Sequence, residues 1–514
     1  MPNIRHALSV KREDDFAAWY QSVISEAEMA EESGVRGCMV IRPWGYGIWE
    51  RIQRLLDDRI KVTGHDNAYF PIFIPLANFE REAEHVEGFA KEMAVVTHHR
   101  LVADGKGGLK PDPEAKLEEP LIVRPTSETI IGDAMARWVR SWRDLPLKLN
   151  QWANVVRWEM RTRMFLRTSE FLWQEGHTAH ADEAEAKEHT LRMLEVYRAC
   201  AEEDLAMPVV AGEKPENERF PGAVETWSIE AMMQDGKALQ AGTSHYLGTN
   251  FSKAANIKYQ DREGGEQLCH TTSWGVSTRM IGGVIMTHGD DDGLRVPPRI
   301  APHQVVILPM LRDKPEDAAL IDYCEELRAS LIREQALGEP IRVLLDTKPG
   351  KAAAKRWDWV RKGAPVIIEV GGRDMENGVV SLLRRDDLWN TENGKPAFKT
   401  PSREEAASGM AAMLEDIQNT LFAQARERRD ANIRRDITTL DGLREFFSAD
   451  AKFPGWAEVE WSKPTGEALE KVVEQLKEMK LTVRNVPMDD AGATGTCIFT
   501  GEPAAEKIYV AKAY

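Results

Sequence analysis

Residues 155–175 read Val-Val-Arg-Trp-Glu-Met-Arg-Thr-Arg-Met-Phe-Leu-Arg-Thr-Ser-Glu-Phe-Leu-Trp-Gln-Glu. The pattern predicts two facing strands joined by a short arginine-rich loop. Arg157 and Glu159 are two positions apart, so in an extended segment their side chains point the same way. With Phe171 just after the loop, such strands can hold a triphosphate and stack an adenine. Taken alone, the charged pair can also be the solvated face of a strand, so the neighbouring sequence has to decide.

Further strings support the nucleotide site. Residues 271–286, Thr-Thr-Ser-Trp-Gly-Val-Ser-Thr-Arg-Met-Ile-Gly-Gly-Val-Ile-Met, place Arg279 at the head of a small-residue segment that predicts a tightly packed, buried helix. The others are Leu-Ile-Val-Arg-Pro-Thr-Ser-Glu-Thr at 121–129, Leu-Pro-Leu-Lys-Leu-Asn-Gln-Trp at 145–152 and Gln-Ala-Gly-Thr-Ser-His-Tyr-Leu-Gly at 240–248. From about Val10 to Tyr514 the chain resembles the class II aminoacyl-tRNA synthetases, and among them the prolyl-tRNA synthetases of the archaeal and eukaryotic type.

The bulk properties predict a multidomain protein outside the membrane. A chain of 514 residues is too long for one core and suggests roughly two to four domains. No apolar run approaches the roughly 18 residues of a membrane span, and the N-terminal segment lacks the apolar core of a secretory signal. We therefore expect no membrane partner and a cytoplasmic location. The net charge of -16 argues against a nucleic-acid coat over the whole surface.

The resemblance implies an α+β fold in three parts. Residues 1–296 are expected to form the class II catalytic domain around an antiparallel sheet, residues 297–401 an α/β anticodon-binding domain, and residues 402–514 a long helix (402 to about 434) with a small α+β domain. Apolar residues at helical spacing after Pro43, followed by an extended segment ending at Pro75, resemble the first class II motif. That motif implies a homodimer, although an apolar helix is also ordinary core. Residues 106–114 suit an exposed loop.

Two family features are missing from the sequence. Gln240 follows Glu175 by 65 positions, which leaves no room for the large editing insertion of many bacterial prolyl enzymes. The C-terminal domain of the family often carries a zinc site of four cysteines, whereas only Cys497 stands in the matching region. A structural zinc site needs four ligands, so we expect no zinc and a domain that folds on its hydrophobic core. His177 and His180 do not suggest a metal site either, since residues three apart on a strand face opposite sides.

Residue by residue, the resemblance implies a catalytic site. Arg157 is expected to bridge the amino-acid carboxylate and the α-phosphate, and Arg279 to clamp the γ-phosphate. The expected ATP contacts are Arg157, Glu159, Arg167, Phe171, Gln240, Thr243, Ser277 and Arg279, and ATP is expected to arrive with Mg²⁺. The expected proline contacts are Thr126, Glu128, Arg157, Trp173, Glu175 and His245. For Thr126 and Glu128 a helix N-terminal capping box remains the alternative.

A basic run between residues 342 and 362, interleaved with Trp357 and Trp359, is a candidate RNA footprint. We expect Lys348, Lys351, Lys355 and Arg356 on the RNA-facing side of the α/β domain, with Glu369 and Arg373 next in line. The alternative is a solvated helix face.

The function implied is ligation of L-proline to tRNA(Pro) through prolyl adenylate. Threonyl, seryl, glycyl or histidyl enzymes share the scaffold and remain alternatives; against threonine, the zinc ligands expected in its pocket are missing. A catalytically inactive, RNA-binding paralogue is another alternative, disfavoured because both phosphate arginines, Arg157 and Arg279, are present.

Overall fold

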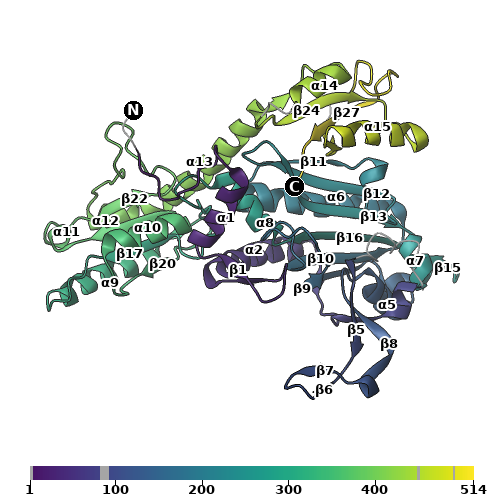
Figure 1. Cartoon of the computed structure of the whole chain (residues 1–514), viewed down its shortest axis with the longest axis horizontal. Coiled ribbons are helices and arrows are strands. Elements are labelled where there is room, and N and C mark those ends of the chain that lie inside the picture. The colour runs from purple at the N-terminus through teal and green to yellow at the C-terminus, as the bar shows by residue number, and fades with distance from the viewer. Residues whose placement is uncertain (1–3, 81–91, 449–451, 490–491) are drawn as a thin grey trace.

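The computed structural model describes residues 4–80, 92–448, 452–489 and 492–514, and its largest sheet includes the strands on either side of the arginine-rich loop (Figure 1). The sheet has eight strands in the order β26-β11-β12-β13-β16-β10-β9-β3. Their bounds are Val486–Pro487, Val209–Glu213, Glu225–Met232, Ala238–Gly248, His270–Ser277, Glu170–His180, Leu147–Val156 and Asp66–Asn67. Neighbours are antiparallel except β3 and β9, which are parallel. The antiparallel sheet expected for residues 1–296 is confirmed.

Helix α6 (Glu183–Ala199) covers one face of this sheet. Its N-cap Asp182 accepts a hydrogen bond from the backbone of Glu185, and a π-helical turn, Cys200–Asp204, continues it. The Tyr197 hydroxyl donates to Gln174 at 2.5 Å. Side chains alternate along a strand, so when Gln174 faces α6, Glu175 and His177 face the other side, which stays open for a site.

Helix α8 (Arg279–His288) is buried from Met280 to His288, as the small-residue pattern predicts. A Cβ on Gly282 would lie 2.5 Å from Leu166 and 2.9 Å from the Tyr20 hydroxyl. The glycine is therefore required by close packing against α1 (Phe16–Glu26) and the loop before β10. This packing fixes the position of Arg279, the first residue of α8.

The first-motif prediction is confirmed at the level of secondary structure. Strands β1 (Ala30–Glu32) and β2 (Met39–Ile41) precede α2 (Pro43–Val62), and β4 (Phe73–Pro75) follows it. The apolar stripe of α2 includes Ile48, Ile52 and Ile60, all of which are buried in the main core.

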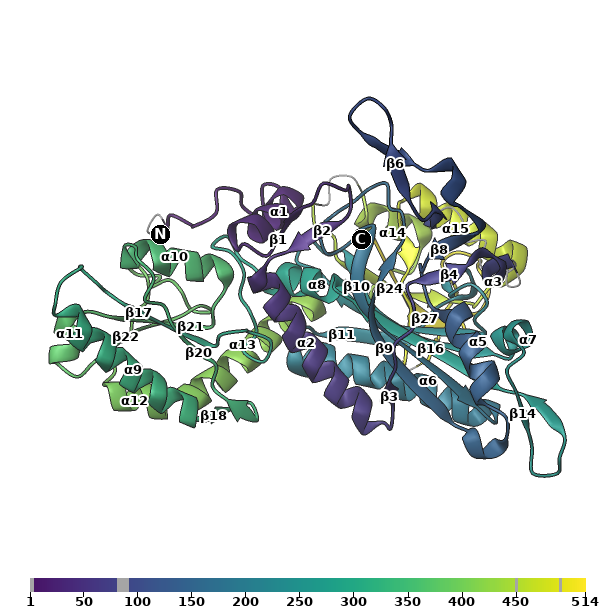
Figure 2. The ribbon, with the colours of Figure 1, turned by 90° about the horizontal axis from the view of Figure 1, so that it is seen from below.

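A small satellite sheet stands beside the main one. Its strands are β4, β8 (Lys116–Val123) and β5 (Ala94–His98), with α3 (Leu76–Glu80) and α5 (Glu128–Trp138) close by. The segment expected as a loop at 106–114 is partly a hairpin, because β7 (Leu109–Pro111) pairs with β6 (Leu101–Ala103). All six strand residues are exposed, and the hairpin projects from the molecule (Figure 2).

The second unit is α/β, as the resemblance implies for residues 297–401. Its sheet has the order β20-β17-β21-β22, with bounds Val343–Leu345, Val305–Pro309, Val366–Val370 and Ser381–Arg384. Strand β17 is parallel to β20 and β21, and β22 is antiparallel. Its helices are α9 (Asp317–Arg333), α10 (Ala352–Lys362) and the short α11 (Gly372–Glu376).

The expected long helix of residues 402–434 is two helices, α12 (Arg403–Ser408) and α13 (Met410–Ala431). The break falls at Gly409, and α13 leads from the second unit to the C-terminal part (Figure 1). There, α14 (Leu440–Phe446) and α15 (Gly466–Glu478) accompany a sheet of β23 (Ile433–Arg434), β24 (Trp456–Trp461), β27 (Glu506–Ala511) and β25 (Thr482–Val483). Cys497 is buried in its apolar core.

The C-terminal part also reaches back to the catalytic sheet. Strand β26 adds to the edge of β11, and Ala513 forms a bridge with Ala238. Short segments such as β26 carry no periodic signal, so this connection was not predicted. No helix among the described residues is long and apolar enough to cross a membrane.

Candidate active site

A cavity of about 240 Å³ opens on the uncovered face of the main sheet. Its walls include Thr126, Glu128, Arg157, Phe171, Trp173, Glu175, Gln240, Thr243, His245, Ser277 and Arg279. Glu159 and Arg167 line an adjoining cavity that shares Arg157, Phe171, Ser277 and Arg279. The structure therefore brings together all the residues predicted for ATP and proline.

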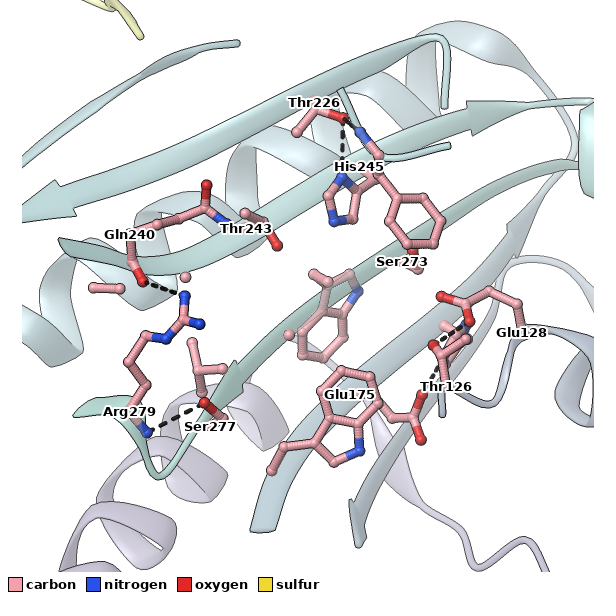
Figure 3. A pocket seen from close by; sticks show the side chains of 18 of the residues that line it. Thr126, Glu128, Glu175, Thr226, Gln240, Thr243, His245, Ser273, Ser277 and Arg279 are labelled. Atoms are coloured by element: carbon pink, nitrogen blue, oxygen red, sulfur yellow. Dashed lines mark hydrogen bonds and ion pairs between the residues drawn. The ribbon is translucent and has the colours of Figure 1, made fainter. Parts of the chain in front are cut away.

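The cavity has two chemically different ends. Figure 3 shows Gln240, Ser277 and Arg279 at one end, and Thr126 and Glu128 at the other. We call the first the arginine end, formed by Arg157, Arg167, Arg279, Gln240 and Ser277, and the second the acidic end, formed by Thr126, Glu128, Glu175, His177 and His245.

The expectation that Arg157 and Glu159 lie on a strand is wrong. Strand β9 stops at Val156, because the ladder with β10 ends at the pair Val156 and Glu170. Arg157 begins the connecting loop, where its Nε donates to the Pro125 carbonyl at 2.9 Å. Its guanidinium lies over the rings of Phe171 and Trp173, 5.6 Å and 5.3 Å from their centroids. The loop position, not strand alternation, aims Arg157 into the cavity.

Arg279 is held at the start of α8. Its backbone N–H bonds the Ser277 hydroxyl at 3.2 Å, while its guanidinium donates to the carbonyls of Leu166 at 3.3 Å and Gln240 at 3.5 Å. These contacts join the loop before β10, strand β13 and strand β16 at one point.

The arginine end concentrates positive charge. Burial, followed by the fields of Arg167 and Arg157, lowers the pKa of Arg279 to about 10. Burial also lowers the pKa of Arg157. Arginine stays charged near neutral pH even so, and guanidinium groups that repel one another are stabilised when an anion comes between them. The arginine end is suited to phosphate groups.

At the acidic end, the Thr126 hydroxyl donates to the Glu128 carboxylate. Helix α5 begins at Glu128, but the side chain of its N-cap, Ser127, makes no capping hydrogen bond. The capping-box alternative is therefore wrong. Glu128 keeps an oxygen that can accept a hydrogen bond from a cationic ligand.

Glu175 is surrounded by protein donors. It accepts from the Ser127 hydroxyl at 2.5 Å, the Ser127 backbone at 3.2 Å and the Gln151 amide at 2.8 Å, and it pairs with His177 at 3.0 Å. Burial opposes its ionisation, but these contacts outweigh burial and lower its pKa. A carboxylate has about four acceptor positions, and these four contacts occupy them. Glu175 therefore holds the side chains of the cavity wall in place.

His245 is neutral at physiological pH, because burial and the neighbouring His177 lower its pKa to about 3. It bonds the Thr226 hydroxyl at 3.0 Å, and its ring lies 4.8 Å from that of Phe220. Thr226, Phe220, Ser127 and Gln151 were not predicted. Thr226 lies opposite His245 in the ladder, and the sequence alone does not indicate which residues pair across two strands. Ser127 and Gln151, in contrast, lie inside the strings at 121–129 and 145–152, where they could have been found.

His177 and His180 face opposite sides of β10, as predicted. His177 bonds Glu175 in the cavity, whereas His180 pairs with Glu185 of α6 at 3.1 Å. The described residues contain no group of three or more His, Cys, Asp or Glu side chains arranged to hold a metal ion.

The predicted RNA footprint is only partly a free surface. Lys348, Lys351 and Arg373 are exposed, but Lys355 is buried and pairs with Asp346 at 3.0 Å. Arg356 pairs with the buried Glu369 at 2.9 Å. The expectation that Lys355 lies on the RNA-facing surface is wrong, because its ammonium neutralises a carboxylate inside the domain.

The aromatic residues of the same run also pack internally. Trp359 lies edge-on to Trp44, with ring centroids 5.5 Å apart, and donates to Asp346 at 3.0 Å. Trp357 lies 5.6 Å from Trp389. Both side chains therefore have protein neighbours.

Comparisons with known proteins agree with this geometry. Residues 112–288 match the family model for the tRNA synthetase class II core domain (G, H, P, S and T), and residues 304–396 match the model for the anticodon binding domain. The chain is 79% identical to a proline–tRNA ligase of Erythrobacter litoralis, with all of both chains covered. It is 70% identical to one of Novosphingobium aromaticivorans, covering 100% of this chain and 99% of the other. A proline–tRNA ligase of Bdellovibrio bacteriovorus is 52% identical, with 99% of each chain covered.

Proposed function

Since the chain belongs to the class II proline–tRNA ligases, we propose that the arginine end of its cavity binds ATP and the acidic end binds L-proline. The enzyme joins proline to tRNA in an ATP-dependent reaction. A proline carboxylate oxygen attacks the α-phosphorus, which forms prolyl adenylate and releases diphosphate. A terminal hydroxyl of tRNA(Pro) then attacks the carbonyl carbon and releases AMP.

One observation carries the proposal: three arginines line one end of the cavity together with the cavity that adjoins it, and Glu128 with Thr126 lines the other end. The proline carboxylate and the α-phosphate repel each other, so cations must lie between them. Arg157, beside Phe171 and Trp173, is positioned to contact both anions, and a planar guanidinium can bind them in a bidentate manner. Stabilisation of developing charge is usually the largest catalytic contribution.

The remaining roles follow from position along the cavity. Arg279 and Arg167 hold the outer phosphates, Glu159 and Phe171 hold the adenine, and Gln240, Thr243 and Ser277 supply polar contacts to the nucleotide. At the other end, Glu128 and Thr126 receive the two hydrogens of the proline ammonium. Trp173 and His245 form the wall around the ring, and Glu175 acts through the side chains that it orients.

Mg²⁺ is expected to enter with ATP. Gln240 and Thr243 offer neutral oxygen donors beside the arginine end, and Glu159 offers a carboxylate. These groups fit an ion that keeps several waters and binds mainly phosphate oxygens. No zinc is proposed for the C-terminal part.

We further propose that the division 1–296, 297–401 and 402–514 describes the domains, that the second of these binds the anticodon of tRNA(Pro), and that Lys348, Lys351 and Arg373 contribute to that surface. Arg356 and Glu369 contribute through their mutual pair. The chain resembles the archaeal and eukaryotic architecture in having only α6 with its π-helical turn, β11, a short 3-10 helix (Glu216–Glu218) and β12 between β10 and β13, although the relatives named above are bacterial. A cytoplasmic location fits a role in protein synthesis.

A homodimer is proposed through the first-motif region. Tyr69 and Phe73, at the end of that region, are 76% and 48% exposed. Large apolar side chains that gather at a surface favour an interface. Sedimentation analysis of the purified chain tests this: a single species at the mass of one chain, at micromolar concentration, contradicts the dimer.

Amino-acid-dependent exchange of diphosphate into ATP tests the assignment of substrates. Exchange is measured with each of the twenty amino acids in turn, and proline is expected to dominate. Faster exchange with threonine, serine, glycine or histidine contradicts the proline site. Absence of exchange with every amino acid, in a folded protein, supports the inactive paralogue.

A further inference from the structure

A buried carboxylate, Glu230, joins the C-terminal part of the chain to the catalytic sheet. Glu230 lies on β12 and is fully buried. It accepts from the Nη2 of Arg484 at 2.7 Å and from its Nε at 3.2 Å, and it pairs with Lys214 at 3.1 Å. Ser228 adds a hydrogen bond of 3.0 Å. Two cations from different parts of the sequence thus neutralise one carboxylate inside the protein.

This cluster lies next to the arginine end of the active site. Glu230 is directly opposite Gln240 in the ladder of β12 and β13, and opposite residues of an antiparallel pair share a face. Arg279 donates to the carbonyl of the same Gln240 at 3.5 Å. The register of the ladder also shifts between Ile229 and Glu230. At such an irregularity the ladder of hydrogen bonds is disrupted and side chains change direction. The backbone conformation near Glu230 therefore depends more on side-chain contacts than on the ladder.

Arg484 is held in place by two other residues of the C-terminal part, one through its backbone and one through its side chain. Its backbone N–H donates to Tyr509 of β27 at 2.7 Å, and its Nη1 donates to the Thr482 hydroxyl at 2.7 Å. Two residues later, β26 pairs with β11. A Cβ on Gly212 would lie 2.2 Å from the Val486 carbonyl oxygen, so a glycine is needed for this close approach. The pairing of β26 with β11 therefore holds Arg484 next to Glu230.

We propose that Arg484 is a positioning residue for ATP, acting through Glu230 on Gln240 and Arg279. The proposal rests on the placement of ATP at the arginine end. A buried charge that loses one of its partners is strongly unfavourable, so removal of Arg484 forces Glu230 and the irregular part of the β12–β13 ladder to rearrange. Gln240 and Arg279 lie next to that rearrangement. Thr126 and Glu128, at the other end of the cavity, do not contact the cluster, so proline binding is expected to be spared.

The test compares substitutions of Arg484 in proline-dependent diphosphate exchange, with KM measured separately for ATP and for proline. We expect Arg484→Ala to raise the KM for ATP about tenfold, which is typical of mutations that act on a site through intervening contacts, and to leave the KM for proline within about twofold, as for a site that shares no partner with Arg484. Arg484→Lys keeps a cation beside Glu230 and should restore most of the ATP affinity, whereas Arg484→Gln should resemble the alanine variant.

Lys463→Ala is the matched control. Lys463 also links the C-terminal part to the catalytic sheet, through Glu213 of β11 at 3.7 Å, but it is half exposed. Its loss should change neither KM. An equal rise of both KM values in Arg484→Ala, no recovery in Arg484→Lys, or the same effect in Lys463→Ala overturns the proposal.

Folding and the placement of ATP are checked separately. Circular dichroism and thermal unfolding show whether each variant is folded; if Arg484→Ala is not, Arg484→Gln and Arg484→Lys provide the comparison, and failure of all three to fold overturns the proposal in favour of a purely structural role. Arg279→Ala is measured alongside. If it leaves the KM for ATP unchanged, the placement of ATP is wrong. If it raises that KM while Arg484→Ala does not, only the inference about Arg484 fails.

Discussion

The guanidinium of Arg385 donates two hydrogen bonds to the carboxylate of Asp290, at 2.8 Å and 2.5 Å. Arg385 follows β22 of the α/β unit, and Asp290 lies two residues beyond the end of α8. Helix α8 carries Arg279 at its other end. A single buried helix therefore has a proposed phosphate ligand at its start and a contact with the α/β unit just past its end.

Replacement of Arg385 with Ala is expected to destabilise the protein by about 3 kcal/mol, because it leaves Asp290 without its principal cation. Arg328→Ala is the control: Arg328 pairs with Glu325 on the surface of α9, and such pairs contribute about 0.5 kcal/mol or less. Urea unfolding at neutral pH compares the two. Equal midpoints for both variants would contradict a structural role for the Arg385 pair.

The same pair predicts a dependence on pH. Burial opposes ionisation of Asp290, but Arg385 outweighs it, and the pKa of Asp290 is lowered. A lowered pKa contributes stability that is present above the unfolded value of about 3.9 and is lost as pH falls through the folded value. The difference in stability between the wild type and Asp290→Asn should therefore shrink below about pH 4. Unfolding measured from pH 7 to pH 3 checks this, and a constant difference contradicts it.

Replacement of Arg157 with Ala should reduce proline-dependent diphosphate exchange by about 10²-fold or more while the fold stays intact, because the interaction that we propose between Arg157 and the α-phosphate strengthens as charge develops. Arg36→Ala is a suitable control, since Arg36 is exposed and contacts the same loop at the Met160 carbonyl. Near-normal exchange by a folded Arg157→Ala protein removes Arg157 from the mechanism.

Replacement of Glu128 with Gln should raise the KM for proline and change the KM for ATP little. The amide keeps the size of the side chain and loses the charge that we propose pairs with the proline ammonium. Glu118→Gln, an exposed change on β8, should alter neither value. If ATP and proline are affected equally in Glu128→Gln, Glu128 has a structural role.

The two exposed lysines of the α/β unit should behave differently from the buried one. Lys348→Ala combined with Lys351→Ala should weaken tRNA binding and flatten its salt dependence, with the slope falling by about 0.7 to 0.9 for each lysine that neutralises a phosphate. Proline activation should be unchanged. Lys355→Ala should instead lower the thermal stability, because Asp346 loses its partner. Filter binding across a salt titration measures the first effect; an unchanged affinity shows that these lysines are only a solvated surface.

Much of the active site was accessible from the sequence because its residues lie in a few contiguous strings. Arg279 at the head of a buried helix, and the facing strands that carry Phe171 and Glu175, are local features that residue type and periodicity express directly. The α/β unit after residue 297 was likewise expected, from the resemblance. The exact end of β9 was not predictable, since it depends on the pairing with β10. That pairing ends at Glu170 and Val156, so Arg157 lies outside the sheet.

By itself, the sequence determined the class of fold, the order of its parts and half of the residues that line the cavity. Only the tertiary structure decided which charges are free and which are neutralised. In the sequence, Lys355 is one more basic residue of a run. In the structure, its ammonium forms an ion pair with Asp346. Glu230 and Arg484 are 254 positions apart and belong to no common motif. Periodicity reports which side of an element is buried, whereas pairing of buried charges depends on which elements meet, and that is settled when the chain folds.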